Sequence, residues 1–167
     1  MFTSPGHITP CLWFDTQAHE AAEFYVGIFP NSQIKRIVDC PRSEHEFHRE
    51  RAGTVLAVTF TLNGISMMAL NGGPQFQFSE AISLQVSCQT QDDVDYYWDR
   101  LSAGGDPQAQ QCGWLKDKYG VSWQVVPDAV QQMLGGDDPA RSERVMNALL
   151  AMKKLDMAAL EAAYVGN

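Results

Sequence analysis

Apolar and polar residues alternate along the chain with two periods, and the changes of period mark the expected elements. A period of two, which is typical of half-buried strands, predicts strands at 8–14, 33–39, 55–62, 65–70 and 81–89. Spacings of three and four, which are typical of an amphipathic helix, predict helices at 15–29 and 92–103. The charged segment 40–52 is expected to be a loop, and a weaker strand is expected at 108–111.

The stretch 112–127 predicts two strands joined by a tight turn. Asp117 and Gly120 suit that turn, because an aspartate side chain bonds its own backbone and glycine accepts a positive φ. Alternation along the second strand gives one apolar face formed by Val121, Trp123 and Val125. The opposite, partly polar face carries Ser122, Gln124 and Val126. A strand with an apolar back and a sparsely polar front is typical of a sheet that lines a pocket.

The two halves of the chain repeat one order of elements: a strand, a helix and about three further strands. Residues 63–70 align without gaps on residues 119–126, and both stretches contain a turn glycine followed by a β-branched residue and a serine. We interpret this as an internal duplication with modules at 8–72 and 80–127. Both modules are expected to belong to one domain, 1–135, followed by a C-terminal helical extension, 136–167. The apolar stripe of that extension is Val145, Ala148, Leu149, Met152 and Leu155.

Composition narrows the function classes. A net charge of −8 without a basic stripe argues against a nucleic-acid partner. Residues 1–10 do not have the pattern of a signal peptide, and no apolar run has membrane-spanning length, so we expect a cytoplasmic protein with no membrane partner. Four widely spaced cysteines without a Cys-x-x-Cys pair favour free thiols over disulfides or a zinc site.

These patterns resemble the vicinal oxygen chelate superfamily, which has the glyoxalase/bleomycin-resistance fold, and within it the PhnB-like or 3-demethylubiquinone-9 3-methyltransferase-like family. The motifs that carry the resemblance are PCLWFD at 10–15, FY at 24–25 with FP at 29–30, ALNGGP at 69–74, EAIS at 80–83, CGWL at 112–115 continuing to Pro127, and MKKLD at 152–156. The resemblance implies an α+β fold in which duplicated βαβββ modules form a curved mixed sheet around a pocket. It also implies a homodimer.

Relatives in this superfamily hold a divalent metal with His and Glu side chains, and the resemblance places those positions at Thr9, Met68, Ala81 and Gln124. None of these four is a good ligand for a hard divalent cation. We therefore expect no metal and no other cofactor. The pair His45 and His48 lies in the charged segment and is interpreted as solvated. The methyltransferase label finds no support in the glycines, since Gly72 and Gly73 precede no predicted helix and Gly104 and Gly105 end one.

The expected ligand pocket consists of Cys11, Trp13, Met68, Asn71, Ser83, Gln85, Trp114, Ser122 and Gln124. Trp13, Trp114, Phe76 and Phe78 are interpreted either as a clamp for a flat ligand or as core and dimer contacts. Cys112 is interpreted as a buried thiol or as a nucleophile. Two classes of function stay open. One is a metal-free protein that binds a small, partly apolar molecule. The other is an enzyme of the superfamily, such as a lyase, an isomerase or a group-transfer catalyst, with no catalytic residue assigned.

Overall fold

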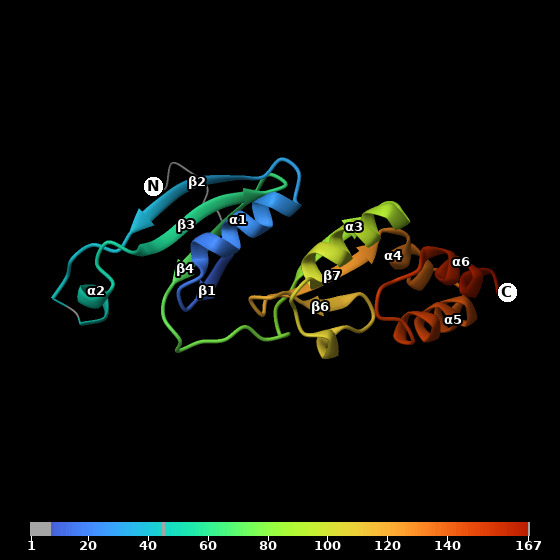
Figure 1. Ribbon diagram of the computed structural model, residues 1–167. Coiled ribbons are helices and arrows are strands. Elements are labelled where there is room, and N and C mark those ends of the chain that lie inside the picture. Colours follow the sequence, from blue (N-terminus) through green and yellow to red (C-terminus); the bar gives the residue numbers. More distant parts are fainter. Residues whose placement is uncertain (1–7, 45, 167) are drawn as a thin grey trace, which may run out of the picture. The chain divides into compact units, whose positions relative to one another are not determined.

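The computed structural model describes residues 8–44 and 46–166 (Figure 1). His45, one of the two histidines noted in the charged segment, lies outside the described residues. The chain divides between Gln77 and Phe78 into two compact units. Each unit is described here by itself.

The first unit is a four-stranded mixed sheet with a helix on one face (Figure 1). Its elements are β1 (Cys11–Phe14), α1 (Ala18–Ile28), β2 (Gln33–Asp39), α2 (Glu46–Glu50), β3 (Val55–Leu62) and β4 (Ile65–Asn71). The strand order is β1-β4-β3-β2, with β1 parallel to β4 and antiparallel pairing elsewhere. The predicted helix and strands of this module are therefore confirmed. The first strand is shorter than expected, and the segment 40–52 contains the short helix α2.

Helix α1 can approach its sheet closely because it presents small side chains. Ala18, Ala21 and Ala22 have no exposed surface, and Tyr25 is fully buried beside them. The sheet supplies the larger partners at alternating positions, which are Leu12, Phe14, Val58, Phe60, Met67 and Ala69. This face is the core of the first unit. The alternate side chains of the same strands are left on the open face.

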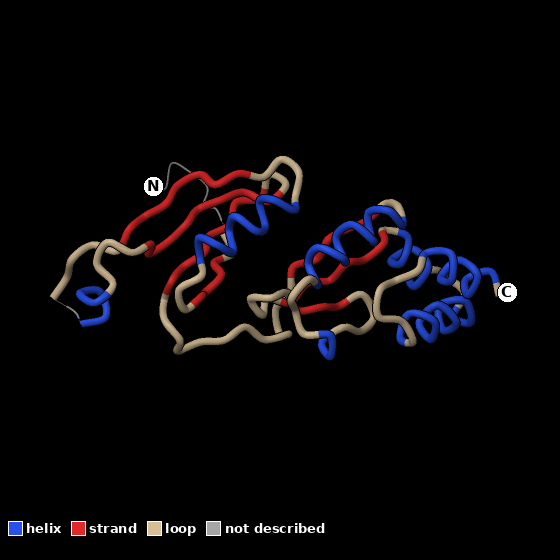
Figure 2. The backbone as a smooth tube through the Cα atoms, viewed as in Figure 1, coloured by secondary structure: helices blue, strands red, loops and turns tan. Residues whose placement is uncertain are grey.

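The second unit repeats the arrangement with three strands and then continues into helices (Figure 2). Its elements are β5 (Leu84–Cys88), α3 (Gln91–Ser102), the 3₁₀ helix η1 (Pro107–Ala109), β6 (Trp114–Lys116), β7 (Ser122–Pro127), α4 (Ala129–Leu134), α5 (Pro139–Leu150) and α6 (Met157–Val165). The strand order is β5-β7-β6, with β5 parallel to β7 and β6 antiparallel to it. These pairings match β1 with β4 and β3 with β4, as the duplication predicts.

The strand expected at 108–111 is wrong. The Asp106 carboxylate accepts a hydrogen bond from the Gln108 backbone nitrogen at 2.8 Å, and Pro107 occupies the first helical position. This pair starts a helical turn and leaves only an isolated bridge between Gln111 and Trp114. The fifth strand also begins later than expected, at Leu84.

The C-terminal helices pack around a core of their own. Val130, Val145, Leu155 and Leu160 are buried together. Asp138 caps α5 with Pro139 at its first turn, and Asp156 caps α6 through the Ala159 backbone nitrogen. These helix starts are as the sequence predicts, and the helices belong to the same compact unit as the second module. Within the described part of the chain, no helix is both long and apolar enough to cross a membrane.

Candidate functional site

The two faces of the second sheet differ in character, and the difference arises from strand alternation. Helix α3 covers the face that carries Val86, Trp123 and Val125, all of them buried. The other face carries a cross-strand row in which Gln124 is paired with Trp114 on one side and with Gln85 on the other. The sequence prediction that Gln124 points away from Trp123 is therefore confirmed. We call the face with Gln124 the front face.

A buried carboxylate fixes the hairpin that presents this face. Asp117 is 2% exposed. One carboxylate oxygen accepts hydrogen bonds from the backbone nitrogens of Tyr119, at 2.9 Å, and Val121, at 3.0 Å. The other oxygen accepts one from the indole nitrogen of Trp123 at 2.8 Å. The same side chain thus shapes the turn and anchors the large residue behind the sheet, which holds the register of β7.

A cavity of about 630 Å³ lies on the front face of the second unit. Its polar and aromatic lining comes from the module and consists of Glu80, Gln108, Gln111, Cys112, Trp114 and Gln124. Its aliphatic lining consists of Ala109, Val126, Val130, Leu149, Leu150 and Leu155. The volume is within the range of small-molecule sites.

The amide of Gln124 is half-buried at this cavity. Its nitrogen donates a hydrogen bond to the Ser83 hydroxyl at 2.8 Å, across from β7 to the residue preceding β5. Among the residues that the structure describes, none donates a hydrogen bond to the amide oxygen. The side chain is therefore held in place by one bond and keeps an acceptor for a ligand.

The cavity carries little net charge. Glu80 is the one charged residue in its lining, and it forms an ion pair with Lys116. The hydrogen bond from Lys116 holds the pKa of Glu80 below its usual range. Because the two charges offset each other, the lining favours an uncharged ligand.

The open face of the first unit holds three of the predicted pocket residues. Cys11 lies opposite Met68 in the register of β1 and β4. The Trp13 indole nitrogen donates to the Gly73 carbonyl at 2.8 Å, and the ring meets Phe76 edge to face at 4.9 Å between centroids. The two rings therefore do not form a parallel clamp. Partial burial raises the pKa of the Cys11 thiol, which keeps it protonated at neutral pH.

Two other predicted pocket residues are buried. Asn71 accepts a hydrogen bond from the Ala18 backbone nitrogen at 2.8 Å and donates to the Val55 carbonyl at 2.9 Å, so its amide ties α1 to the sheet. Parity is the signal for this placement, because Asn71 shares the covered face with Ala69. Ser122 is 2% exposed, and its hydroxyl has no hydrogen-bond partner among the described residues.

The structure brings Ser83, Trp114 and Gln124 together in the second unit, with Gln85 exposed at the edge of their row. Sequence reasoning did not include Glu80, Gln108 or Gln111, nor the leucines of the C-terminal extension. The apolar stripe of the extension indicated burial, yet nothing local in it indicates the surface that it covers. Cys112 is half-buried and lines the cavity, between the two interpretations given to it.

The metal positions implied by the superfamily do not fit a divalent cation. Met68 offers a thioether and the Gln124 amide is bonded to Ser83, while Ala81 has no donor atom. Within residues 8–44 and 46–166, His, Cys, Asp and Glu side chains do not gather in a group of three or more that could hold a metal.

Solved structures define the class of fold. The chain is similar to a protein from Pseudomonas aeruginosa, with 16% identity, a TM-score of 0.59 and coverage of 74% of this chain and 98% of that one. It is also similar to the fosfomycin resistance protein FosX from Mesorhizobium loti, with 12% identity, a TM-score of 0.54 and coverage of 80% of this chain and 100% of that one. These neighbours and the paired sheets define the glyoxalase/bleomycin-resistance fold of the vicinal oxygen chelate superfamily.

The family follows from sequence similarity. The pattern of the 3-demethylubiquinone-9 3-methyltransferase family matches residues 6–126. The PhnB protein from Bacillus cereus is 36% identical over 73% of this chain and 99% of its own, with a TM-score of 0.60. The chain belongs to this PhnB-like family. No curated protein gives a significant sequence match.

Proposed function

We propose that this protein binds a small, uncharged and partly apolar molecule in the front-face cavity of its second module, without a metal. The observation that carries the proposal is the cavity itself: about 630 Å³, with neutral hydrogen-bonding groups on one side and aliphatic side chains on the other. Pockets of this kind, mainly apolar with a few placed polar groups, are the common form of small-molecule sites.

The polar side of the cavity suits a group that both donates and accepts hydrogen bonds. Gln108, Gln111 and Gln124 offer amide donors and acceptors without bringing a charge that would need a counterion. Trp114 adds a flat apolar surface beside Gln124. An amide, an alcohol or a neutral heterocycle matches this lining better than a phosphate or a carboxylate.

The enzyme class of the superfamily is less consistent with these residues. A chelating metal needs carboxylate or imidazole ligands, and the implied positions carry Met68, Ala81 and Gln124 instead. A S-adenosylmethionine site of the usual kind is also not built here: Gly72 and Gly73 lead into a loop, and Gly104 and Gly105 follow α3. Elemental analysis of protein purified without chelators tests this, and a stoichiometric divalent metal would favour the enzyme.

The test of the binding proposal has two stages. A thermal-shift screen with neutral amides, alcohols and heterocycles should find a stabilising compound, since a ligand at 100 times its Kd stabilises by about 2.7 kcal/mol. Gln124→Leu should then weaken binding of that compound by more than about 1 kcal/mol in calorimetry, the usual scale for one hydrogen bond. The exposed Gln132→Leu on α4 is the matched control and should bind as the parent does. Equal affinities in all three proteins would contradict the role of Gln124.

We also propose that the protein is a homodimer. In each described sheet the outer strands, β1 and β2 in the first and β5 and β6 in the second, have an edge unpaired within the unit. Unpaired edges promote association. On β2 the side chain of Ile37 is 43% exposed. Light scattering should give twice the chain mass of 18.6 kDa at micromolar concentration; a monomer mass would contradict this.

A cytoplasmic location is proposed from the thiols. All four cysteines are free, and two of them, Cys40 and Cys88, are buried. Free thiols are the usual state in a reducing compartment. Cell fractionation would check the location.

A further inference from the structure

The C-terminal extension adds a wall to the cavity that the family pattern does not include. That pattern ends at residue 126, and the PhnB protein is matched over 99% of its length by only 73% of this chain. Beyond residue 126, the chain contributes Val130, Leu149, Leu150 and Leu155 to the cavity lining. These four side chains are entirely aliphatic, whereas the module supplies all of the polar lining.

The extension is tied to the module through an unusual backbone turn at the start of β6. Cys112 and Gly113 both have positive φ, 53° and 81°. This conformation turns their two backbone nitrogens toward the extension, where they donate to the carbonyls of Met152 and Lys153, each at 2.8 Å. A Cβ at Gly113 would lie 2.9 Å from the Val125 carbonyl oxygen and 3.1 Å from a methyl group of Leu155.

A second set of bonds holds the extension to α3. The Gln91 side chain donates to the Leu155 carbonyl at 3.2 Å and accepts from the Met157 nitrogen at 2.9 Å. Lys154 forms an ion pair with Asp95 at 2.7 Å, which lowers the pKa of the Asp95 carboxyl. The segment between α5 and α6 is thus fixed on both sides.

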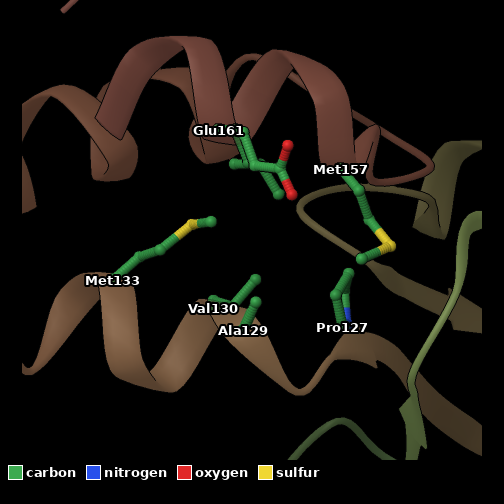
Figure 3. Close-up of a pocket in the computed structure, with 7 residues that line it drawn as sticks. Pro127, Ala129, Val130, Met133, Met157 and Glu161 are labelled. Carbon is green, nitrogen blue, oxygen red and sulfur yellow. The ribbon is translucent and has the colours of Figure 1, made fainter. Parts of the chain in front are cut away.

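The helices of the extension are also packed against one another. Figure 3 shows Met133 of α4 and Met157 and Glu161 of α6 facing each other across a shallow crevice. That crevice leaves no room for a water molecule. Close packing and fixed connections make the aliphatic wall a preformed surface, and a preformed wall loses little entropy when a ligand binds.

We infer that residues 127–166 determine ligand specificity by providing the apolar half of the site. The inference rests on the proposed function and extends it to a ligand class: an amphiphile with a neutral hydrogen-bonding head at Gln124 and an aliphatic portion of several carbons against Leu149 and Leu150. Relatives that end where the family pattern ends offer the polar half without this wall.

The test uses primary alkyl amides as probes, from acetamide through butanamide and hexanamide to octanamide, with binding to the full chain measured by ligand-observed NMR. The head group is constant and only the aliphatic part grows. With the wall present, affinity should rise about threefold to fourfold for each added methylene, as for transfer of a methylene out of water. Leu150 is 52% exposed, so it can be replaced without disturbing the core.

Two replacements of Leu150 separate the wall from the head group. Leu150→Gln should reduce the gain for each methylene to less than about twofold, and Leu150→Trp should weaken octanamide far more than acetamide. Met146→Gln, one turn earlier on α5 and 40% exposed, is the matched control and should leave the series unchanged. Gln124→Leu should weaken all members by a similar factor, and melting curves confirm that each variant is folded.

The outcomes separate the inference from the proposed function. If amides bind and Gln124→Leu weakens them while the Leu150 variants leave the chain-length dependence unchanged, the specificity role of the extension is wrong and the site remains. If no member of the series binds up to millimolar concentration, both are overturned. A loss of chain-length dependence in the Leu150 variants alone supports the inference.

Discussion

Replacement of Asp117 should destabilise the second unit more than any ordinary surface change. Its carboxylate is 2% exposed and accepts three hydrogen bonds, two from backbone nitrogens and one from the Trp123 indole. Asp117→Ala removes all three acceptors at once. The donors on Val121 and Trp123 are buried and would be left without their partner.

The size of the effect follows from those donors. A buried donor that loses its partner costs about 1–3 kcal/mol, and the partly buried Tyr119 nitrogen adds about 1 kcal/mol. The free energy of unfolding should therefore fall by about 3–5 kcal/mol. Domains of this size are stable by only about 5–15 kcal/mol, so the variant should be folded but close to its limit. Asp117→Asn keeps one acceptor and should lose less.

Urea denaturation followed by circular dichroism measures the change as a shift of the midpoint at constant slope. Asp106→Ala is the control, because the exposed Asp106 accepts a single capping bond and its loss should cost about 1 kcal/mol. A double-mutant cycle of Asp117→Asn with Trp123→Phe isolates the indole bond, with an expected coupling of about 1–2 kcal/mol. If Asp117→Ala costs no more than Asp106→Ala, the reasoning is refuted.

Three further predictions concern other contacts. Gly72→Ala should destabilise the first unit in urea titrations, because the new Cβ would overlap the Trp13 ring; unchanged stability would contradict that packing. Asn71→Ala should lower the free energy of unfolding by about 2–3 kcal/mol, since two buried hydrogen bonds are lost; a change below about 0.5 kcal/mol would contradict its structural role. Because Lys116 lowers the pKa of Glu80, the contribution of this pair to stability is present above about pH 4.3, the ordinary glutamate value, and is lost as pH falls through the lower folded pKa. In an NMR titration Lys116→Gln should raise the pKa of Glu80, and an unchanged pKa would contradict the pairing.

The sequence determined the elements whose signals are local. The strands at 33–39 and 55–62 have the predicted bounds because alternation along one strand is visible without knowledge of its partner. The turn at Asp117 and the helix start at Asp138 depend on hydrogen bonds within a few residues. Local signals also contained the correction at 108–111, since an aspartate followed by proline favours a helical start.

Tertiary structure decided which residues share a surface. Asn71 was predicted to line a pocket, and the structure places it against the first turn of α1, which lies 53 residues earlier in the chain. The aliphatic stripe around Leu149 was visible in the sequence, but only the folded chain places it against a cavity with Gln124. A helical period states that one face is buried, because apolar side chains avoid water. It does not state what covers that face, because contacts between distant segments depend on the packing of the whole unit.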